Sequence, residues 1–282
     1  MYKFHTNYSK IYENIVASTF TYIDANKIKS LIIGMSGGID STLTAALAYE
    51  IAKLFDGQLH VIGNIIDIES EKDEIKRGIE SATMFCHSSE YTDLKSVFWL
   101  LSEDVMGLPL GNDLKSRTQM GNIKARLRMI KLYDLAKKHD GLVLSTDNYT
   151  EYLLGFWTLH GDVGDFGMLQ NLWKTEVYGM ATYLQTKFYK LGKFGQADAI
   201  RSCIEAMPTD GLGITNSDFD QLCPEASKNG SPAEVYNKID TLLYNSVIEQ
   251  KPCEDEVILR YRNTKFKRSN PLSIPREYIV SK

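Results

Sequence analysis

The sequence predicts an α/β fold in which a doubly wound, mostly parallel sheet is followed by a helical C-terminal part. Short apolar segments alternate with longer segments of helical periodicity over roughly the first half of the chain. A turn with two adjacent glycines joins the first apolar segment to the next helical one. In the last third of the chain, apolar side chains recur at helical spacing. The alternation favours parallel strands that are covered by helices on both faces.

The predicted elements of the first half begin with a helix and then alternate. Ile11, Ile15 and Ile23 recur with helical spacing, and Lys29–Gly34 is a short apolar run typical of a buried strand. The expected helices are 9–28, 42–54, 69–80 and 121–139, and the expected strands are 29–34, 59–66 and 142–145. A helix between consecutive strands allows those strands to lie parallel.

Glycine and proline interrupt the regular patterns. Pro109 and Gly111 indicate a mobile loop over residues 108–116. Four glycines and the lack of a regular period indicate a functional loop over residues 155–171. The remaining predicted elements are helices at 175–188, 197–205, 233–248 and 254–262, with a loop at 207–216.

Composition and charge exclude several classes of protein. The chain has 282 residues and a net charge of -4, which gives no overall attraction to nucleic acid or anionic lipid. No run of about 18 consecutive apolar residues is present, so no membrane span is expected. The four cysteines form no C-x-x-C pair, which favours reduced thiols in a cytoplasmic protein over a zinc site or disulfides. Because the net charge is negative, an anionic substrate is expected to bind to local clusters of cations.

The turn after the first strand has the chemistry of a phosphate-binding loop. Its residues are Gly34, Met35, Ser36, Gly37, Gly38, Ile39, Asp40 and Ser41. The glycines let the backbone approach an anion, and the start of the next helix points amide groups at it. Two serines add hydroxyl donors, and Asp40 offers a carboxylate to Mg²⁺. No lysine follows the glycines as in a Walker A loop. The alternative is an ordinary tight turn before a helix.

The segment 36–41 resembles the S-G-G-x-D-S loop of the PP-loop ATP pyrophosphatases, which hold the β and γ phosphates of ATP while the α phosphorus is attacked. Segments 121–129, 145–151 and 155–162 resemble those of ammonia-dependent NAD synthetases in order and spacing. The resemblance extends from the first strand to Arg268. It implies a Rossmann-like fold of the adenine nucleotide alpha hydrolase type. It also implies that ATP adenylates the nicotinate carboxylate of deamido-NAD, and that ammonia then gives NAD, with AMP and pyrophosphate released.

The same resemblance implies roles in ATP and metal binding. Thr146 and Thr209 match threonines that contact ATP, and Lys174 matches a lysine that neutralises ATP phosphate during catalysis. Asp40 and Glu151 match two carboxylates that bind Mg²⁺. Each of these residues also has a structural alternative. Thr146 suits a helix cap and Thr209 suits a turn. Lys174 suits a helix terminus and Glu151 suits an exposed surface.

Three further residues match contacts to deamido-NAD. Arg126 corresponds to the family's substrate arginine, whereas Lys124 and Arg128 share another helical face and suit solvation of the helix. Asp165 corresponds to a substrate aspartate when one residue is deleted shortly before it. Lys267 corresponds to a phosphate contact, although basic clusters of this kind are usually solvated surface.

The sequence departs from the family pattern at the acceptor side. Leu159 stands where many members have a substrate-binding lysine, and Phe266 stands where they have histidine. An aromatic ring at Phe266 is able to stack on a substrate ring instead. If the helix after the last strand begins at Asp147, then Asp147 and Glu151 share one face. The adenine-side contacts over residues 64–74 lack the family's usual side chains.

We expect residues 1–282 to form a single synthetase domain, with a nucleotide-binding core at 1–190 and a helical extension at 191–282. The phosphate loop begins too early in the chain for a glutaminase domain before it, so nitrogen is expected from free ammonia or a separate amidotransferase subunit. The resemblance implies a homodimer with substrate at the subunit interface. Two alternatives are another PP-loop enzyme with a different acceptor and a non-enzymatic nucleotide-binding protein.

Overall fold

The computed structural model describes residues 4–107, 113–161, 163–209, 211–215, 217–223, 231–269 and 271–279. Within these residues, one sheet has the strand order β3-β2-β1-β4-β5, and every paired strand is parallel. Its strands are β1 (Ser30–Gly34), β2 (His60–Asp67), β3 (Ser88–Asp93), β4 (Gly141–Ser145) and β5 (Phe166–Gly167). The predicted α/β class with a parallel sheet is confirmed.

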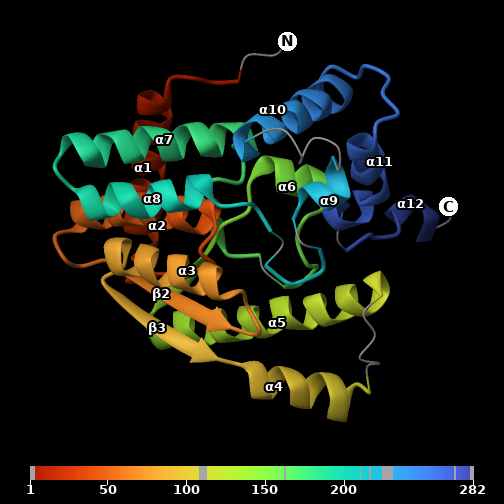
Figure 1. Cartoon of the computed structure of the whole chain (residues 1–282), viewed down its shortest axis with the longest axis horizontal. Coiled ribbons are helices and arrows are strands. Elements are labelled where there is room, and N and C mark those ends of the chain that lie inside the picture. Colours follow the sequence, from red (N-terminus) through yellow and green to blue (C-terminus); the bar gives the residue numbers. More distant parts are fainter. Residues whose placement is uncertain are drawn as a thin grey trace.

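Helices lie on both faces of the sheet (Figure 1). The helices of the first half are α1 (Tyr8–Asn26), α2 (Ile39–Ala52), α3 (Lys72–Phe85), α4 (Lys95–Trp99), α5 (Leu114–Lys138) and α6 (Tyr149–Leu154). Those of the second half are α7 (Lys174–Lys190), α8 (Phe194–Glu205), α9 (Phe219–Leu222), α10 (Pro232–Leu243), α11 (Glu256–Asn263) and α12 (Arg276–Ile279). The second half is therefore helical, as the sequence predicts.

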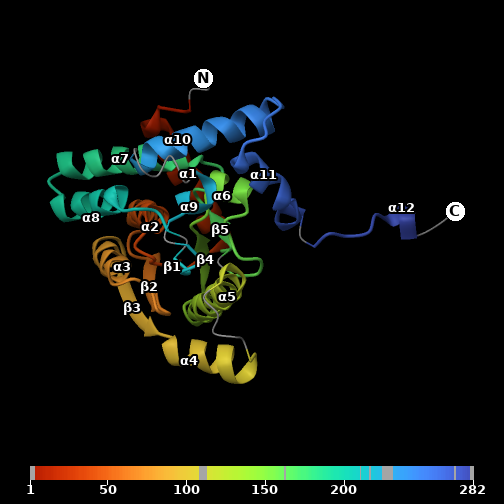
Figure 2. The ribbon, with the colours of Figure 1, turned by 45° about the vertical axis from the view of Figure 1, so that its right-hand side comes forward.

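Alternation of side chains along the strands builds two apolar layers. Leu31 and Ile33 of β1 pack with Leu47 of α2 in the main core, whereas Ile32 faces the other way and packs with Leu135 of α5. The main core also includes apolar residues of α7, α8, α10 and α11. Figure 2 shows α4 and α5 on the opposite side of the sheet from α2, α7 and α8.

The order of the strands places a topological switch point between β1 and β4. The strand β1 pairs with β2 on one side and with β4 on the other. In open α/β sheets, ligands bind at the carboxyl ends of the strands where the order reverses. The glycine turn after β1 and Thr146 after β4 therefore lie at the edge where a ligand is expected.

Several elements differ from the sequence predictions. The edge strand β3 and helix α4 were not predicted, and α5 begins at Leu114, before the expected residue 121. Part of the expected loop at 108–116 lies outside the described residues, as do Asp162, Asp210 and Asn216. Strand β5 lies inside the expected loop 155–171. None of the described helices has the length and apolar character needed to cross a lipid bilayer.

Candidate functional site

A cavity of about 540 Å³ opens at the carboxyl edge of the sheet. That volume lies within the roughly 300–1,000 Å³ of small-molecule sites. Its walls come from the glycine turn, the ends of β2 and β4, one face of α5, and parts of α3, α6, α7 and α11. The cations lining it are Arg77, Arg128, Lys174, Arg260 and Lys267. The carboxylates lining it are Asp40, Glu74, Asp147, Glu151 and Asp218. The cavity therefore has the size of a small-molecule site and offers charge of both signs.

The glycine turn is held close against helix α3. Gly37 has a φ of 79°, and a Cβ added to it would lie 2.1 Å from the carbonyl oxygen of Glu74. The Arg77 Nε donates to the Gly37 carbonyl oxygen over 3.0 Å. The hydroxyl oxygens of Ser36 and Ser41 lie 3.0 Å apart. Both the positive φ and the close approach require glycine at position 37.

The first turn of α2 begins directly after the glycines. Gly38 is the N-cap residue, and Ile39, Asp40 and Ser41 follow in the first turn. The first amide groups of a helix have no partner within the helix and carry the positive end of its dipole. All the predicted turn residues except Gly37 line the cavity. The turn therefore presents to the cavity a surface that suits a phosphate group.

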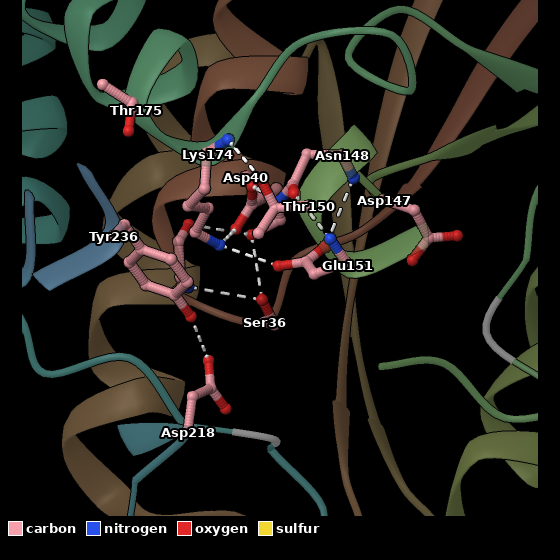
Figure 3. Close-up of polar contacts among 12 residues, drawn as sticks. Ser36, Asp40, Asp147, Asn148, Thr150, Glu151, Lys174, Thr175, Asp218 and Tyr236 are labelled. Atoms are coloured by element: carbon pink, nitrogen blue, oxygen red, sulfur yellow. Dashed lines mark hydrogen bonds and ion pairs between the residues drawn. The ribbon is translucent and has the colours of Figure 1, made fainter. Parts of the chain in front are cut away.

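Three charged side chains meet at the centre of the site (Figure 3). The Lys174 Nζ lies 2.5 Å from the Asp40 Oδ2 and 2.8 Å from the Glu151 Oε1. Only 3% of the Lys174 side chain is exposed. The Asn148 Nδ2 donates to the Asp40 Oδ1 over 2.9 Å. Residues from α2, α6 and α7 are thus brought together around one ammonium group.

Burial and mutual charge shift the pKa values of this cluster. Burial would lower the pKa of Lys174, but the carboxylates of Asp40 and Glu151 raise it well above its usual value. The ammonium therefore stays charged at neutral pH. Burial and the charge of Asp40 raise the pKa of Glu151 to about 7, against the opposing effect of Lys174.

Helix α6 positions Glu151 through a capping box. The side chain of the N-cap residue Asn148 accepts from the Glu151 amide over 3.0 Å, and the Glu151 Oε2 accepts from the Asn148 amide over 3.2 Å. The helix begins at Tyr149. The condition under which Asp147 and Glu151 would share one helical face, a start at Asp147, is not met, because Asn148 is the N-cap residue. Asp147 points away from the cluster in Figure 3, although it lines the cavity.

The two carboxylates suit a magnesium ion that also binds phosphate. Within the described residues, no cluster of three or more His, Cys, Asp or Glu side chains is placed to hold a metal by itself. Mg²⁺ usually takes one or two carboxylates and completes its shell with water and substrate phosphates. Asp40 and Glu151 supply carboxylates beside the phosphate-binding turn, so the donor set fits such an ion.

Thr146 and Thr209 both line the cavity. Thr146 directly follows β4, and the Thr209 hydroxyl donates to the Glu74 Oε1 across the cavity mouth. Leu212, three residues after Thr209, also lines the cavity. The structure therefore brings both threonines into the lining of the cavity that also contains the glycine turn.

The predicted substrate residues are divided between the cavity and the surface. Lys267 lines the cavity, and its Nζ donates to the Gly155 carbonyl oxygen over 2.7 Å. Arg126 is exposed outside the cavity lining, and its Nη2 donates to the Leu159 carbonyl oxygen over 3.1 Å. Asp165 also lies outside it, where it accepts from the Tyr133 hydroxyl over 3.0 Å. Burial and, to a smaller extent, the hydrogen bond to Asp165 raise the pKa of Tyr133 to about 12.

Three arginines that line the cavity were not selected from the sequence: Arg77, Arg128 and Arg260. Arg128 donates to the Ser70 hydroxyl over 3.2 Å and to the Gly211 carbonyl oxygen over 2.9 Å. Its interpretation as a side chain that solvates the helix is wrong, because α5 turns this face inward. The Arg260 guanidinium lies 3.8 Å from the centre of the Phe156 ring.

The two departures from the family pattern have different surroundings. Phe266 is 60% exposed and does not line the cavity, so its proposed stacking on a substrate ring finds no support within one chain. Leu159 offers its carbonyl oxygen to Arg126, in the loop after α6. Trp157, two residues earlier, lines the cavity beneath Lys267, whose Nζ lies 5.6 Å from the centre of the indole ring.

The comparisons with known proteins agree with this geometry. The family profile described as NAD synthase matches residues 11–273. The chain belongs to the NAD synthase family. An NH(3)-dependent NAD(+) synthetase of Mycoplasma genitalium is 33% identical over 217 residues, covering 77% of this chain and 83% of that protein. One from Pseudomonas putida strain GB-1 is 28% identical over 253 residues, covering 88% and 84%.

Solved structures of the same fold include NAD synthase family enzymes. The NMN synthetase from Francisella tularensis aligns with a TM-score of 0.70 at 20% identity, over 96% of this chain and 99% of its own. The NH3-dependent NAD synthetase from Campylobacter jejuni aligns with a TM-score of 0.62 at 20% identity, over 95% and 100%. At this level of identity the alignments establish the fold, and family membership comes from the sequence matches.

Proposed function

We propose that this NAD synthase family member amidates deamido-NAD to NAD, using ATP and ammonia and releasing AMP and pyrophosphate. The observation that carries the proposal is the convergence of the glycine turn with Asp40, Glu151 and Lys174 in one cavity at the switch point of the sheet. It supports a carbon-nitrogen ligase that splits ATP between the α and β phosphates.

The glycine turn binds the pyrophosphate end of ATP. Backbone amides of the first turn of α2 and the hydroxyl groups of Ser36 and Ser41 donate hydrogen bonds to the β and γ phosphates. Thr146 and Thr209, on neighbouring walls of the cavity, contact the rest of the nucleotide. The α phosphorus is thereby held where the carboxylate of the acceptor can reach it.

Lys174 and the two carboxylates balance the charge of the reacting phosphates. The raised pKa of Lys174 keeps its ammonium protonated beside the leaving pyrophosphate. Asp40 and Glu151 would hold Mg²⁺, which, when bound, neutralises phosphate charge. No protein nucleophile is required, because the acceptor carboxylate attacks phosphorus and ammonia then displaces AMP from the mixed anhydride.

The acceptor occupies the part of the cavity beside Lys267. Lys267 and Arg260 supply positive charge there, and Phe156 and Trp157 supply aromatic surface. This chemistry suits a phosphorylated pyridine nucleotide. In a homodimer with substrate at the subunit interface, the exposed Arg126 of one subunit would contact the substrate that is bound in the other subunit. We further propose a cytoplasmic location and free ammonia, or a separate amidotransferase subunit, as the source of nitrogen.

Pyrophosphate release in the presence of ATP, Mg²⁺ and ammonia tests this function. We expect release only when deamido-NAD is also supplied, with one NAD formed for each pyrophosphate. ATP cleavage that needs some other acid would retain the PP-loop chemistry and contradict the acceptor. Binding of ATP without cleavage in the presence of any acid would leave only a nucleotide-binding protein.

Asp40→Ala should abolish turnover while the protein still folds. The substitution removes a carboxylate from the Lys174 cluster and from the magnesium donor set. The matched control is Asp24→Ala, which removes an exposed carboxylate paired with Lys27 on α1. Circular dichroism should show native helix content in both variants. A near-normal rate for Asp40→Ala would contradict the role of Asp40.

A mononucleotide is the second candidate acceptor. The protein from Francisella tularensis is described as an NMN synthetase, and its fold aligns with 96% of this chain. Leu159 and Phe266 replace polar residues that many family members use for the dinucleotide. The kcat/KM values for deamido-NAD and for the carboxylate counterpart of NMN decide between them. A higher value for the mononucleotide would make it the substrate.

A further inference from the structure

Asp240 of α10 is a fully buried carboxylate behind the catalytic cluster. Within the described residues no cationic side chain pairs with it. Burying an unpaired carboxylate is costly unless hydrogen bonds compensate. Asp240 accepts from the Thr150 hydroxyl over 2.6 Å, from the Thr175 hydroxyl over 2.6 Å and from the Thr175 amide over 2.8 Å. The carboxylate is thus satisfied by groups of two other helices.

These hydrogen bonds connect the residues that are adjacent in the chain to Glu151 and to Lys174. Thr150 directly precedes Glu151 in α6, and Thr175 directly follows Lys174 in α7. The Lys174 amide donates to the Thr150 hydroxyl over 2.8 Å. One carboxylate therefore joins the segment that carries Glu151 to the segment that carries Lys174. An anion at the start of α7 is also favoured by the dipole of that helix.

The same helix contacts the ammonium group of Lys174 directly. The Lys174 Nζ lies 5.3 Å from the centre of the Tyr236 ring, one turn before Asp240 on α10. The Tyr236 hydroxyl donates to the Asp218 Oδ2 over 2.7 Å, as Figure 3 shows. Both Tyr236 and Asp240 are buried. Helix α10 therefore contacts both the backbone next to Lys174, through Asp240, and the Lys174 side chain, through Tyr236.

We propose that Asp240 is a positioning residue, which fixes Lys174 and Glu151 relative to Asp40 so that they meet the phosphates of ATP in the reactive geometry. The inference rests on the proposed ATP-dependent function of this site. Asp240 acts only through Lys174 and Glu151. It therefore affects ATP binding and turnover to the extent that those side chains are displaced, and a misplacement of about 1 Å can cost about a hundredfold in rate.

The test is Asp240→Asn, alone and in a Lys174→Ala background. The amide keeps the shape of the carboxylate but places a donor against donors from Thr150 or Thr175. We expect kcat for pyrophosphate release to fall at least about tenfold, and the affinity for ATP with Mg²⁺ to fall in the same protein. In the Lys174→Ala background, Asp240→Asn should lower ATP affinity by a clearly smaller factor than in the unmodified protein, because only the part of its effect that passes through Glu151 remains.

Glu50→Gln is the matched control, because Glu50 is also buried but pairs with Lys187 and Lys53 away from the cavity. It should leave kcat and ATP affinity unchanged. Equal losses from Asp240→Asn with and without Lys174 would overturn the inference, since a general loss of structure acts in both backgrounds. Unchanged turnover in Asp240→Asn would overturn it as well.

Substitutions of Thr175 keep the test decisive if Asp240→Asn does not fold. Thr175→Ser keeps the hydroxyl donor and should retain wild-type kcat, whereas Thr175→Val keeps the shape and should lose most of it. Equal activity of the two variants would overturn the inference. Failure of the proposed function appears differently, as an absence of turnover in the unmodified protein. The ATP-affinity measurements then still decide whether Asp240 acts through Lys174.

Discussion

Single residues of the phosphate loop were predictable because the motif is contiguous. The turn 34–41 contains its own glycines, hydroxyl groups and carboxylate, so its chemistry can be read from neighbouring letters. Asp240 and Arg260 were not predictable in this way. They reach the site from helices about two hundred residues later, and only the packing of those helices distinguishes them from ordinary polar side chains.

Gly37→Ala should destabilise the loop more than Gly57→Ala. Both glycines have a positive φ, 79° and 81°, but only a Cβ at Gly37 would meet another group, the Glu74 carbonyl oxygen. Gly57→Ala should cost only the backbone strain, about 1–2 kcal/mol. Gly37→Ala should cost more and also weaken ATP binding. Urea unfolding and ATP titration of both variants measure the difference, and equal effects would show that the clash at position 37 is relieved cheaply.

Whole elements were predicted where apolar periodicity was strong. The strands β1, β2 and β4 are buried runs, and their bounds agree with the sequence within one or two residues. Strand β3 was missed because its sequence, SSEYTD, is polar and mostly exposed at the edge of the sheet. The start of helix α6 was left open because its six residues give little periodicity, and the structure sets it by the cap at Asn148.

The packing of α1, α2 and α7 depends on the ionised state of Glu50. Burial would raise the pKa of Glu50, but hydrogen bonds from Lys187, Lys53 and Tyr12 lower it to about 2. Because this folded-state pKa is below the ordinary 4.5, the stabilisation is present above pH 4.5 and is lost as the pH falls toward 2. Glu50→Gln should therefore lower the free energy of unfolding at neutral pH by about 1–3 kcal/mol.

The difference between Glu50→Gln and the unmodified protein should shrink as the pH falls from 4.5 toward 2. Urea unfolding at several pH values measures it. Glu13→Gln is the control, because Glu13 is an exposed partner of Lys10 and its removal should change little at any pH. A difference for Glu50→Gln that stays constant with pH would contradict the ionic origin of this stabilisation.

At the scale of the whole molecule, the main hydrophobic core contains residues from both sides of the expected boundary at residue 190. Leu31 of β1, Val177 of α7 and Ile239 of α10 belong to one buried apolar cluster. We therefore propose that the expected core 1–190 and extension 191–282 form one cooperative unit. Length and composition allowed one large domain or a domain with an appendage, and they could not show that the later helices complete the core of the earlier ones.

A chain that ends after residue 190 should not fold, because it lacks Ile200, Val235 and Ile239 of the main core. A chain that ends after Ser269 is the control, since the described residues 271–279 that it lacks are exposed. The full chain should unfold in one step, with far-ultraviolet circular dichroism and tryptophan fluorescence changing together. Two separate transitions would show that the extension is a domain of its own.

The position of Asp240 has a consequence for how the protein is made. Residues 40 and 240 are 200 positions apart, so at about 5–20 residues per second the ribosome adds Asp240 about 10–40 seconds after Asp40. Until then, the segments that carry Lys174 and Glu151 lack the carboxylate that joins them. An unfinished chain on the ribosome should therefore not cleave ATP before α10 has been synthesised and packed.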